Sequence, residues 1–281
     1  MILLTGATGT VGGLVARRLS GVPVRLLSRD PRRVAAAPRV EVVGGDFGDP
    51  ASLDRALTGV RSALLVTADP LTHAHDENFL AAARRAGVRQ VVKLSALAVT
   101  DAGAADLVTR WQRRNEQLLR ESGLLWTLLR PRAFMTNTLG WARSVREEGV
   151  VRAQNGSAVN ATVDPRDLAE VAARVLLEPD GHAGRAYALT GPEALSAVQQ
   201  TGILAELLQR PLRFEELTEA EALRLLHARY PGAVADALVE SAARGRAGAK
   251  ARVEPTVAEL VGRPPGDYRA WARDHLAAYG A

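Results

Sequence analysis

The sequence predicts an α/β protein with a Rossmann-type, doubly wound parallel sheet and a small, mostly helical C-terminal substrate lobe. Apolar runs of strand length alternate with segments of helical period through the first two thirds of the chain. A glycine-rich turn directly follows the opening apolar run, and the part after Leu195 is mostly of helical type. We expect a single domain over residues 1–281, with its core at about 1–190 and the capping lobe at about 191–281.

Each element of the core is predicted from the spacing of its apolar residues. The expected strands are Ile2–Thr5, Val24–Ser28, Val40–Gly44, Ser62–Thr67, Gln90–Ser95 and Trp126–Arg130. The expected helices between them are Thr10–Leu19, Ser52–Leu57, Asp76–Ala86 and Ala105–Ser122. Beyond Pro131 we expect a short strand that ends at Val163, a helix at Pro165–Leu177, strands at Arg185–Thr190 and Leu212–Leu217, and a flexible stretch at Ala242–Ala251.

Composition excludes several classes of site. The chain has no cysteine, which removes disulfides, thiolate nucleophiles and Cys-ligated zinc, and the five histidines offer no convincing metal site. The net charge is +5, but the arginines are spread along the whole length and form no dense tract, so no nucleic-acid partner is expected. No apolar run approaches the roughly twenty residues of a membrane span. We expect a cytoplasmic monomer or homodimer whose partner is a small molecule.

The strongest motif is a glycine turn between the first strand and the first helix. It reads Thr5-Gly6-Ala7-Thr8-Gly9-Thr10-Val11-Gly12. Gly6 permits the tight turn, Gly9 lets the backbone approach a pyrophosphate, and Gly12 lets the helix pack against the strand. Backbone N–H groups at the start of the helix then face the anion, so Gly6, Thr8, Gly9, Thr10, Val11 and Gly12 are predicted to bind a dinucleotide.

The end of the second strand indicates which dinucleotide is bound. An acidic residue there suits the 2′-hydroxyl of NAD, whereas an arginine suits the 2′-phosphate of NADP. The chain has Ser28 and Arg29 at this place, which favours NADP(H), and Asp30 one residue later keeps NAD(H) open. The alternative is that the arginines from 29 to 33 only solvate a loop.

Three further residues are assigned to the cofactor site from their places after strands. Asp46 is expected to accept a hydrogen bond from the adenine amino group, or else to cap the following turn. Phe47 packs beside it, and Thr67 ends the fourth strand. The cofactor-binding prediction therefore adds Ser28, Arg29, Asp46, Phe47 and Thr67 to the glycine turn.

The chain resembles the NmrA-like atypical short-chain dehydrogenases, among them the quinone oxidoreductase type 2-like NAD(P)H-binding proteins. The resemblance is carried by the glycine turn, Arg29-Asp30-Pro31, Gly45-Asp46, the segment from Glu116 to Asn137 with its Arg130-Pro131 and Phe134-Met135 pairs, and Val163-Asp164-Pro165-Arg166-Asp167-Leu168-Ala169. It covers nearly the whole chain. It implies the fold and an NAD(P)H-dependent oxidoreductase, and it says little about the substrate.

The Tyr-x-x-x-Lys pair of ordinary short-chain dehydrogenases is missing, because every tyrosine lies downstream of the helix that should carry it. Atypical relatives place a Lys or His eleven residues before the glycine that ends this helix, and counting back from Gly123 gives Gln112. Its amide can hold a carbonyl oxygen but does not titrate. The predicted polar groups near the nicotinamide are Gln112, Ser95 and Asn137. Each has a structural alternative: Gln112 faces solvent, Ser95 only ends a strand, and Asn137 caps a helix.

Phe134 and Met135 are predicted to form apolar walls of a substrate pocket, or else to belong to the core. The leading hypothesis is an NADPH-dependent oxidoreductase that transfers a hydride to a quinone or a conjugated apolar carbonyl compound, because a stabilised product anion can take its proton from water. The alternatives are a non-catalytic NADP(H)-binding redox sensor and a biosynthetic enzyme that catalyses a non-redox step.

Overall fold

The computed structural model describes residues 1–34 and 38–280. The chain divides into two units, each assembled from three stretches. Unit 1 consists of residues Met1–Ala96, Trp111–Pro131 and Pro165–Ala188, and unit 2 consists of Leu97–Arg110, Arg132–Asp164 and Leu189–Ala281. The last change of unit lies between residues 188 and 189, and unit 2 also takes two stretches from the middle of the chain; the expected division into a core and a capping lobe stays a prediction.

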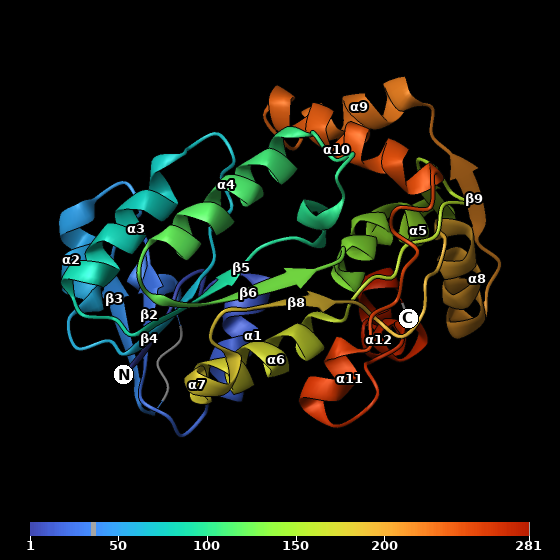
Figure 1. The fold of residues 1–281 in the computed structure, drawn as a ribbon. Coiled ribbons are helices and arrows are strands. Elements are labelled where there is room, and N and C mark those ends of the chain that lie inside the picture. The colour runs from blue at the N-terminus through green and yellow to red at the C-terminus, as the bar shows by residue number, and fades with distance from the viewer. Residues whose placement is uncertain (35–37, 281) are drawn as a thin grey trace. The chain divides into compact units, whose positions relative to one another are not determined.

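A seven-stranded sheet forms the centre of unit 1 (Figure 1). Its strands are β1 (Ile2–Leu4), β2 (Val24–Ser28), β3 (Val40–Gly44), β4 (Ser62–Leu65), β5 (Gln90–Leu94), β6 (Leu125–Pro131) and β8 (Arg185–Leu189), whose last residue belongs to unit 2. The strand order is β3-β2-β1-β4-β5-β6-β8, and the pairs from β3 to β6 are parallel. The order reverses between β1 and β4, where sheets of this class bind their ligands. The predicted Rossmann-type fold is confirmed.

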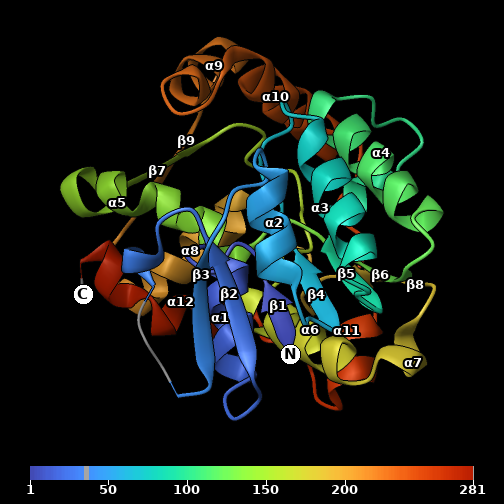
Figure 2. The ribbon, with the colours of Figure 1, turned by 90° about the vertical axis from the view of Figure 1, so that its left-hand side faces the viewer.

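Helices cover both faces of this sheet (Figures 1 and 2). On one face lie α2 (Pro50–Leu57), α3 (Ala74–Arg85) and α4 (Leu107–Glu121), and on the other lie α1 (Thr10–Arg18) and α6 (Pro165–Leu177); α7 (Pro179–His182) and the 3-10 turn η1 (Pro31–Arg33) are short. Leu53, Leu65, Phe79, Val91 and Leu119 belong to one buried cluster that joins the strands to α2, α3 and α4. Both faces of the strands are therefore apolar, as expected for a parallel sheet.

Unit 2 contains a second, two-stranded sheet in which β7 (Val150–Ala153) runs parallel to β9 (Arg213–Glu216). Its helices are α5 (Ala142–Glu148), α8 (Ala197–Leu208), α9 (Glu219–His227), α10 (Gly232–Arg246), α11 (Thr256–Val261) and α12 (Tyr268–Asp274), with 3-10 turns η2 (Leu97–Thr100), η3 (Met135–Trp141) and η4 (Leu276–Tyr279). Tyr268, Trp271 and Tyr279 are fully or almost fully buried in its core with Met135 and Val145. This aromatic cluster gives unit 2 its own hydrophobic centre.

The structure corrects three sequence predictions after Pro131. No strand ends at Val163, which forms only an isolated bridge with Phe134. β7 lies in a segment that was not expected to contain a strand. The stretch 242–251 is not wholly irregular, because α10 continues through Arg246. Val163 and β7 each pair with a segment distant in sequence, which periodicity does not reveal.

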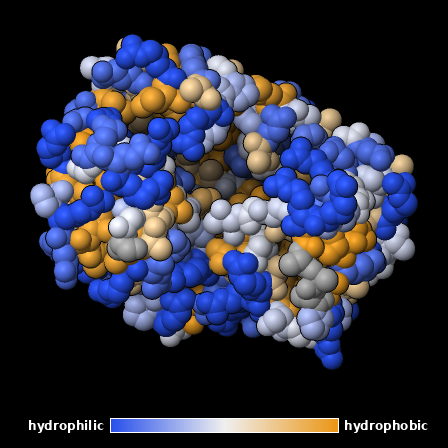
Figure 3. Space-filling view, turned by 180° about the vertical axis from the view of Figure 1, so that it is seen from behind, coloured by the Kyte–Doolittle hydropathy of each residue, from blue (hydrophilic) through white to orange (hydrophobic). Residues whose placement is uncertain are grey.

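On the face drawn in Figure 3, hydrophobic areas are interspersed with hydrophilic ones. Among the described residues the exposed large hydrophobic side chains are scattered over seven positions, from Met1 to Val253. None of the helices in the described ranges has the length and hydropathy needed to cross a membrane.

Candidate cofactor site at the carboxyl ends of the strands

The glycine turn has the geometry that the sequence predicts. Gly6 has a φ of +65°, a left-handed conformation that glycine adopts without strain. The N–H of Gly9 donates to the carbonyl oxygen of Gly6 at 2.9 Å and closes the turn. A Cβ atom on Gly12 would lie 2.3 Å from the same carbonyl oxygen, so α1 can approach β1 this closely only with glycine there.

The first turn of α1 is free to bind an anion. Gly9 is the N-cap, no side chain caps the helix, and the first turn holds no acidic residue. The leading N–H groups of a helix have no partner within the helix and lie at the positive end of its dipole. These donors face the end of β2, where two arginines stand.

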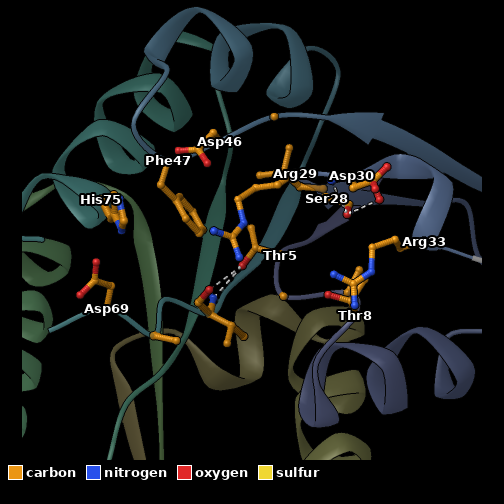
Figure 4. A pocket seen from close by; sticks show the side chains of 16 residues that line it. Thr5, Thr8, Ser28, Arg29, Asp30, Arg33, Asp46, Phe47, Asp69 and His75 are labelled. Carbon is orange, nitrogen blue, oxygen red and sulfur yellow. Dashed lines mark hydrogen bonds between the residues drawn. The ribbon is translucent and has the colours of Figure 1, made fainter. Parts of the chain in front are cut away.

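A pocket of about 600 Å³ opens beside this turn. It is lined by residues from the ends of β1, β2, β3 and β4 and from the loops that follow them: Thr5, Gly6, Ala7, Thr8, Leu27, Ser28, Arg29, Asp30, Arg33, Gly45, Asp46, Phe47, Val66, Ala68, Asp69 and His75. Figure 4 shows these side chains around one cavity. The pocket lies at the point where the strand order reverses, as the fold predicts.

Two of the arginines after β2 have no acidic partner, whereas the one between them does. Arg32 donates to both carboxylate oxygens of Asp30, at 2.9 and 3.2 Å, and this hydrogen bond is the main reason why the pKa of Asp30 is lowered. Arg29 and Arg33 line the pocket without an ion pair to any described residue, and Arg33 extends toward Thr8 (Figure 4). The loop therefore presents the guanidinium groups of Arg29 and Arg33 to the cavity, while the carboxylate of Asp30 is paired with Arg32.

The opposite end of the pocket is suited to a planar, weakly polar group. The Phe47 ring lies 5.5 Å from the His75 ring and 6.1 Å from the Phe79 ring, measured between centroids. Asp46 accepts a hydrogen bond from the N–H of Gly48 at 2.7 Å, so it caps the turn as the alternative interpretation supposed, and it also lines the pocket. Both predicted roles of Asp46 are compatible with this geometry.

Two predicted cofactor contacts use their hydroxyl groups within the protein. The Ser28 hydroxyl donates to the carbonyl oxygen of Asp30 at 3.0 Å and accepts from its N–H. Thr67 does not line the pocket. Its hydroxyl donates to Asp76 at 2.8 Å and accepts from the ammonium group of Lys93 at 3.2 Å, and all three side chains are buried. The Thr67 hydroxyl thus supports this buried ion pair, and its contact with the cofactor stays a prediction.

Farther along the sheet, α4 carries two buried amide side chains with unpartnered polar atoms. Gln112 is 7% exposed with its Oε1 unpartnered, so it does not face solvent. Asn115, one turn later on the same helix, is 1% exposed, and neither atom of its amide has a partner. Buried amides are normally satisfied, so an unpartnered pair is unusual. Sequence reasoning missed Asn115 because its burial could not be seen.

Ser95, the third polar candidate of unit 1, is tied to an ion-pair network. Its hydroxyl donates to Glu116 at 2.6 Å, and Arg130 donates to the two oxygens of the same carboxylate at 2.6 and 2.8 Å. Burial by itself raises the pKa of Glu116, but the hydrogen bonds from Arg130 and Ser95 and the charges of Arg130 and Arg120 outweigh burial, so the pKa is lowered. Ser95 therefore helps to hold an ionised carboxylate.

The remaining predicted residues belong to unit 2. Asn137 is exposed on η3, where its side chain makes no cap. Phe134 is half-buried, and Met135 is 1% exposed within the aromatic core, in keeping with the core alternative for that residue. Their proposed contacts with substrate or nicotinamide stay predictions.

Comparison with known proteins identifies the family. The model of a family described as NAD(P)H-binding matches residues 6–179. The chain belongs to this family. The matched range contains the glycine turn from Gly6 onward, the arginines after β2 and both amides of α4. The predicted NAD(P)H-dependent oxidoreductase class is confirmed at the level of the family.

Three relatives show how far the family likeness extends. A Streptomyces griseus protein named (4-alkanoyl-5-oxo-2,5-dihydrofuran-3-yl)methyl phosphate reductase is 54% identical over 281 residues and covers 99% of both chains. An NAD(P)H azoreductase of Xenophilus azovorans is 34% identical over the whole of both chains. The structure of an NADPH-dependent quinone oxidoreductase of Escherichia coli in complex with NADPH has a TM-score of 0.87 and 30% identity, over 99% of this chain and 100% of that one.

The structure adds residues to the candidate site that the sequence did not reveal. Arg33, Asp69 and His75 line the pocket although none was predicted to do so. Arg33 reaches it because η1 turns the chain back after Asp30, and the pattern Asp30-Pro31 was the only signal for such a turn. Asp69 comes from the loop between β4 and α3 and His75 from the first turn of α3, where the sequence gives no comparable signal.

Proposed function

We propose that the protein is an NADPH-dependent reductase of an electron-poor, conjugated carbonyl compound, and specifically of a phosphorylated 4-alkanoyl butenolide. The observation that carries the proposal is the pocket of unit 1, where an uncapped helix start and two unpaired guanidinium groups surround a cavity that an NADP phosphate and pyrophosphate would fill. The substrate class is supported by the Streptomyces griseus reductase, which is 54% identical over nearly the full length.

The chemistry of such an acceptor explains why no tyrosine and lysine pair is needed. The dinucleotide supplies a hydride when bound. The ring carbon–carbon double bond of the butenolide is conjugated to both the lactone carbonyl and the alkanoyl carbonyl, so hydride addition at the far carbon places the displaced electron pair on an enolate shared by two oxygens. This anion is stabilised without a protein acid, and its carbon then takes a proton from water.

In this proposal Gln112 and Asn115 orient the acceptor. Amide N–H groups are suited to donate to a carbonyl oxygen, and the buried Nδ2 of Asn115 has no partner in the structure, while Gln112 is buried beside it on the same helix. A donor that is already in place where negative charge develops lowers the barrier more than one that must reorganise. Ser95 acts through Glu116 and Arg130 and is a positioning residue.

Cofactor choice follows from the two arginines. Arg29→Ala and Arg33→Ala are each expected to weaken NADPH binding by about 1–3 kcal/mol through loss of a charge-assisted phosphate contact, and to spare NADH. Arg17→Ala, which removes an exposed positive charge from the last turn of α1, serves as the matched control. Dissociation constants from fluorescence titration provide the measurement. Equal losses for both dinucleotides would contradict the assignment.

Turnover of a substrate panel tests the activity. NADPH oxidation is followed with the phosphorylated butenolide, its dephosphorylated form, a benzoquinone and an azo dye. The phosphorylated butenolide is expected to have the highest kcat/KM. A higher value for the quinone would favour quinone reduction, which the quinone oxidoreductase structure makes the second candidate. Cofactor binding without turnover of any acceptor would leave the redox-sensor hypothesis.

A further inference from the structure

Unit 2 contains a group of three cations that the cofactor site does not use: Arg132, Arg244 and Lys250. Arg132 directly follows β6, Arg244 lies in the last turn of α10, and Lys250 comes six residues later. All three are partly or mostly buried, although long cationic side chains normally extend into solvent. Their burial requires either counter-charges or a bound anion.

Backbone hydrogen bonds hold the segment of Lys250 beside the segment of Arg132. The N–H of Val163 donates to the carbonyl oxygen of Ala133 at 2.9 Å. Two residues earlier, the N–H of Ala161 donates to the carbonyl oxygen of Lys250 at 3.0 Å. The stretch 161–163 therefore bridges the two segments, and their cations interact electrostatically.

Arg244 has its counter-charges within the protein. Its guanidinium lies 2.7 Å from a carboxylate oxygen of Asp106 and 3.4 Å from one of Asp101. Asp106 is 2% exposed and also accepts from the N–H and hydroxyl of Thr109. Burial by itself raises the pKa of Asp106, but the hydrogen bonds from Thr109 and Arg244 outweigh it and the pKa is lowered. Arg244 is thus a fixed, compensated charge at one side of the group.

Arg132 and Lys250 are not compensated in this way. Within the described ranges, the Arg132 side chain has no ion pair, and its buried Nε has no hydrogen-bond partner. The Lys250 ammonium donates to the hydroxyl of Ser241 at 3.1 Å and has no carboxylate within ion-pair distance. The nearby carboxylate of Glu254 pairs instead with Arg252 at 2.8 Å. The charges of Asp101 and Glu254 act on Arg132, and that of Asp106 acts on Lys250, but burial outweighs them and the pKa of each cation is lowered.

The electrostatic cost of this arrangement is visible in the pKa values. Burial lowers the pKa of Arg132 from its ordinary value. Burial, and then the charges of Arg244 and Arg132, lower the pKa of Lys250 to about 8. An anion seated between the two side chains would offset both effects. Strongly perturbed cations of this kind are typical of binding sites.

We propose that Arg132 and Lys250, with Arg244 fixed beside them, form an anion site of unit 2 that binds a phosphate monoester. The choice of a phosphate monoester rests on the proposed function, and the argument for an anion stands on unit 2 alone. A phosphate monoester is mostly a dianion near neutral pH, and it matches two cations that have no direct ion pair with a described residue. The planar fork of an arginine binds two phosphate oxygens, and a lysine adds a point charge.

Kinetics with paired substrates test this assignment. Arg132→Gln and Lys250→Gln are each expected to raise KM for the phosphorylated butenolide about 10- to 100-fold, the effect of losing a hydrogen bond to a charged group. KM for the dephosphorylated butenolide and the dissociation constant of NADPH should stay near their wild-type values. Arg143→Gln, which removes an exposed arginine of α5, is the matched control and should change none of these constants.

A second measurement does not depend on turnover. Inorganic phosphate is titrated calorimetrically into protein saturated with NADP⁺, so that the phosphate sites of unit 1 are filled. Wild type and Arg143→Gln should bind phosphate, whereas Arg132→Gln and Lys250→Gln should not. The two substitutions lie on different segments, so a variant that fails to fold leaves the other to decide.

The outcomes separate the two proposals. If neither butenolide is reduced but phosphate binding depends on Arg132 and Lys250, the proposed function fails and the anion site stands. If the phosphorylated butenolide is reduced while both substitutions leave its KM and phosphate binding unchanged, the anion site is overturned. Absence of phosphate binding to wild type, with unchanged KM values in both variants, also overturns it.

Discussion

Replacing Lys93 by methionine is expected to lower the free energy of unfolding by about 3–5 kcal/mol, because it leaves a buried carboxylate without its counter-ion. The Lys93 ammonium lies 2.7 and 3.2 Å from the two oxygens of Asp76 and 3.2 Å from the Thr67 hydroxyl. The side chains of Lys93 and Asp76 are 0% and 1% exposed. Methionine keeps most of the volume, so the loss comes chiefly from the charge and little from a cavity.

The size of the effect follows from what remains around Asp76. After the substitution its carboxylate keeps one hydrogen bond, from the Thr67 hydroxyl at 2.8 Å. The double variant Lys93→Met with Asp76→Asn removes both charges and should recover most of the loss, since neutral groups replace a buried ion pair at little cost. Arg85→Met breaks the exposed pair with Asp54 and should cost only about 0–1 kcal/mol.

Urea denaturation at neutral pH, monitored by circular dichroism, provides the measurement. With m-values of about 1–3 kcal/mol per molar, the Lys93→Met midpoint should fall by about 1 M or more. The reasoning is refuted if Lys93→Met costs no more than Arg85→Met. It is also refuted if the double variant is as unstable as Lys93→Met, because the loss would then not arise from an uncompensated Asp76.

Three further predictions concern single positions. Gly12→Ala should abolish NADPH binding in a fluorescence titration, because the new Cβ would lie 2.3 Å from the carbonyl oxygen of Gly6. Gly13→Ala is the control and should retain measurable affinity, because its Cβ would lie 3.3 Å from the carbonyl oxygen of Ala7. The pKa of Glu116 is lowered on folding, so its stabilisation is present above its ordinary value of 4.5 and is lost as the pH falls through the lowered value. The urea midpoint of Glu116→Gln should therefore fall less than that of wild type between pH 7 and pH 3, and equal falls would contradict this. The pKa of Lys250 is lowered to about 8, so its destabilising effect is fully present below pH 8 and fades as the pH rises toward 10.5. Lys250→Met should raise the urea midpoint at pH 7 more than at pH 10, and an equal rise at both would refute the assignment.

The sequence was sufficient to predict the central sheet because each of its strands is a self-contained apolar run. β2 and β3 have the predicted bounds, and β1, β4, β5 and β6 differ from them by at most two residues at an end. The glycine turn was equally readable, since its function depends on consecutive residues. β7 could not be found in this way, because a four-residue strand is defined by its partner β9, about sixty residues later.

The same distinction separates the site residues that were found from those that were missed. Arg29 could be assigned from its distance to the end of a strand, whereas Arg33 enters the pocket only because a 3-10 turn redirects the chain. The Thr67 hydroxyl is engaged by Lys93, which lies 26 residues later on the neighbouring strand. Asn115 is buried whereas its neighbour Arg114 is exposed, because the two side chains lie on different faces of α4. These properties are set by tertiary packing.

The chain passes between the two units five times, and three of these passages lie at or near the carboxyl ends of β5, β6 and β8. A truncation that stops at residue 131 would thus remove α6 and most of β8 from unit 1, and no contiguous fragment contains either unit alone. We therefore expect co-translational folding of the sheet to wait until about residue 188 has left the ribosome. The two segments of unit 2 between passages, 97–110 and 132–164, can vary in sequence without interrupting a strand of the seven-stranded sheet, which gives evolution a way to change the acceptor while the nucleotide-binding framework is kept.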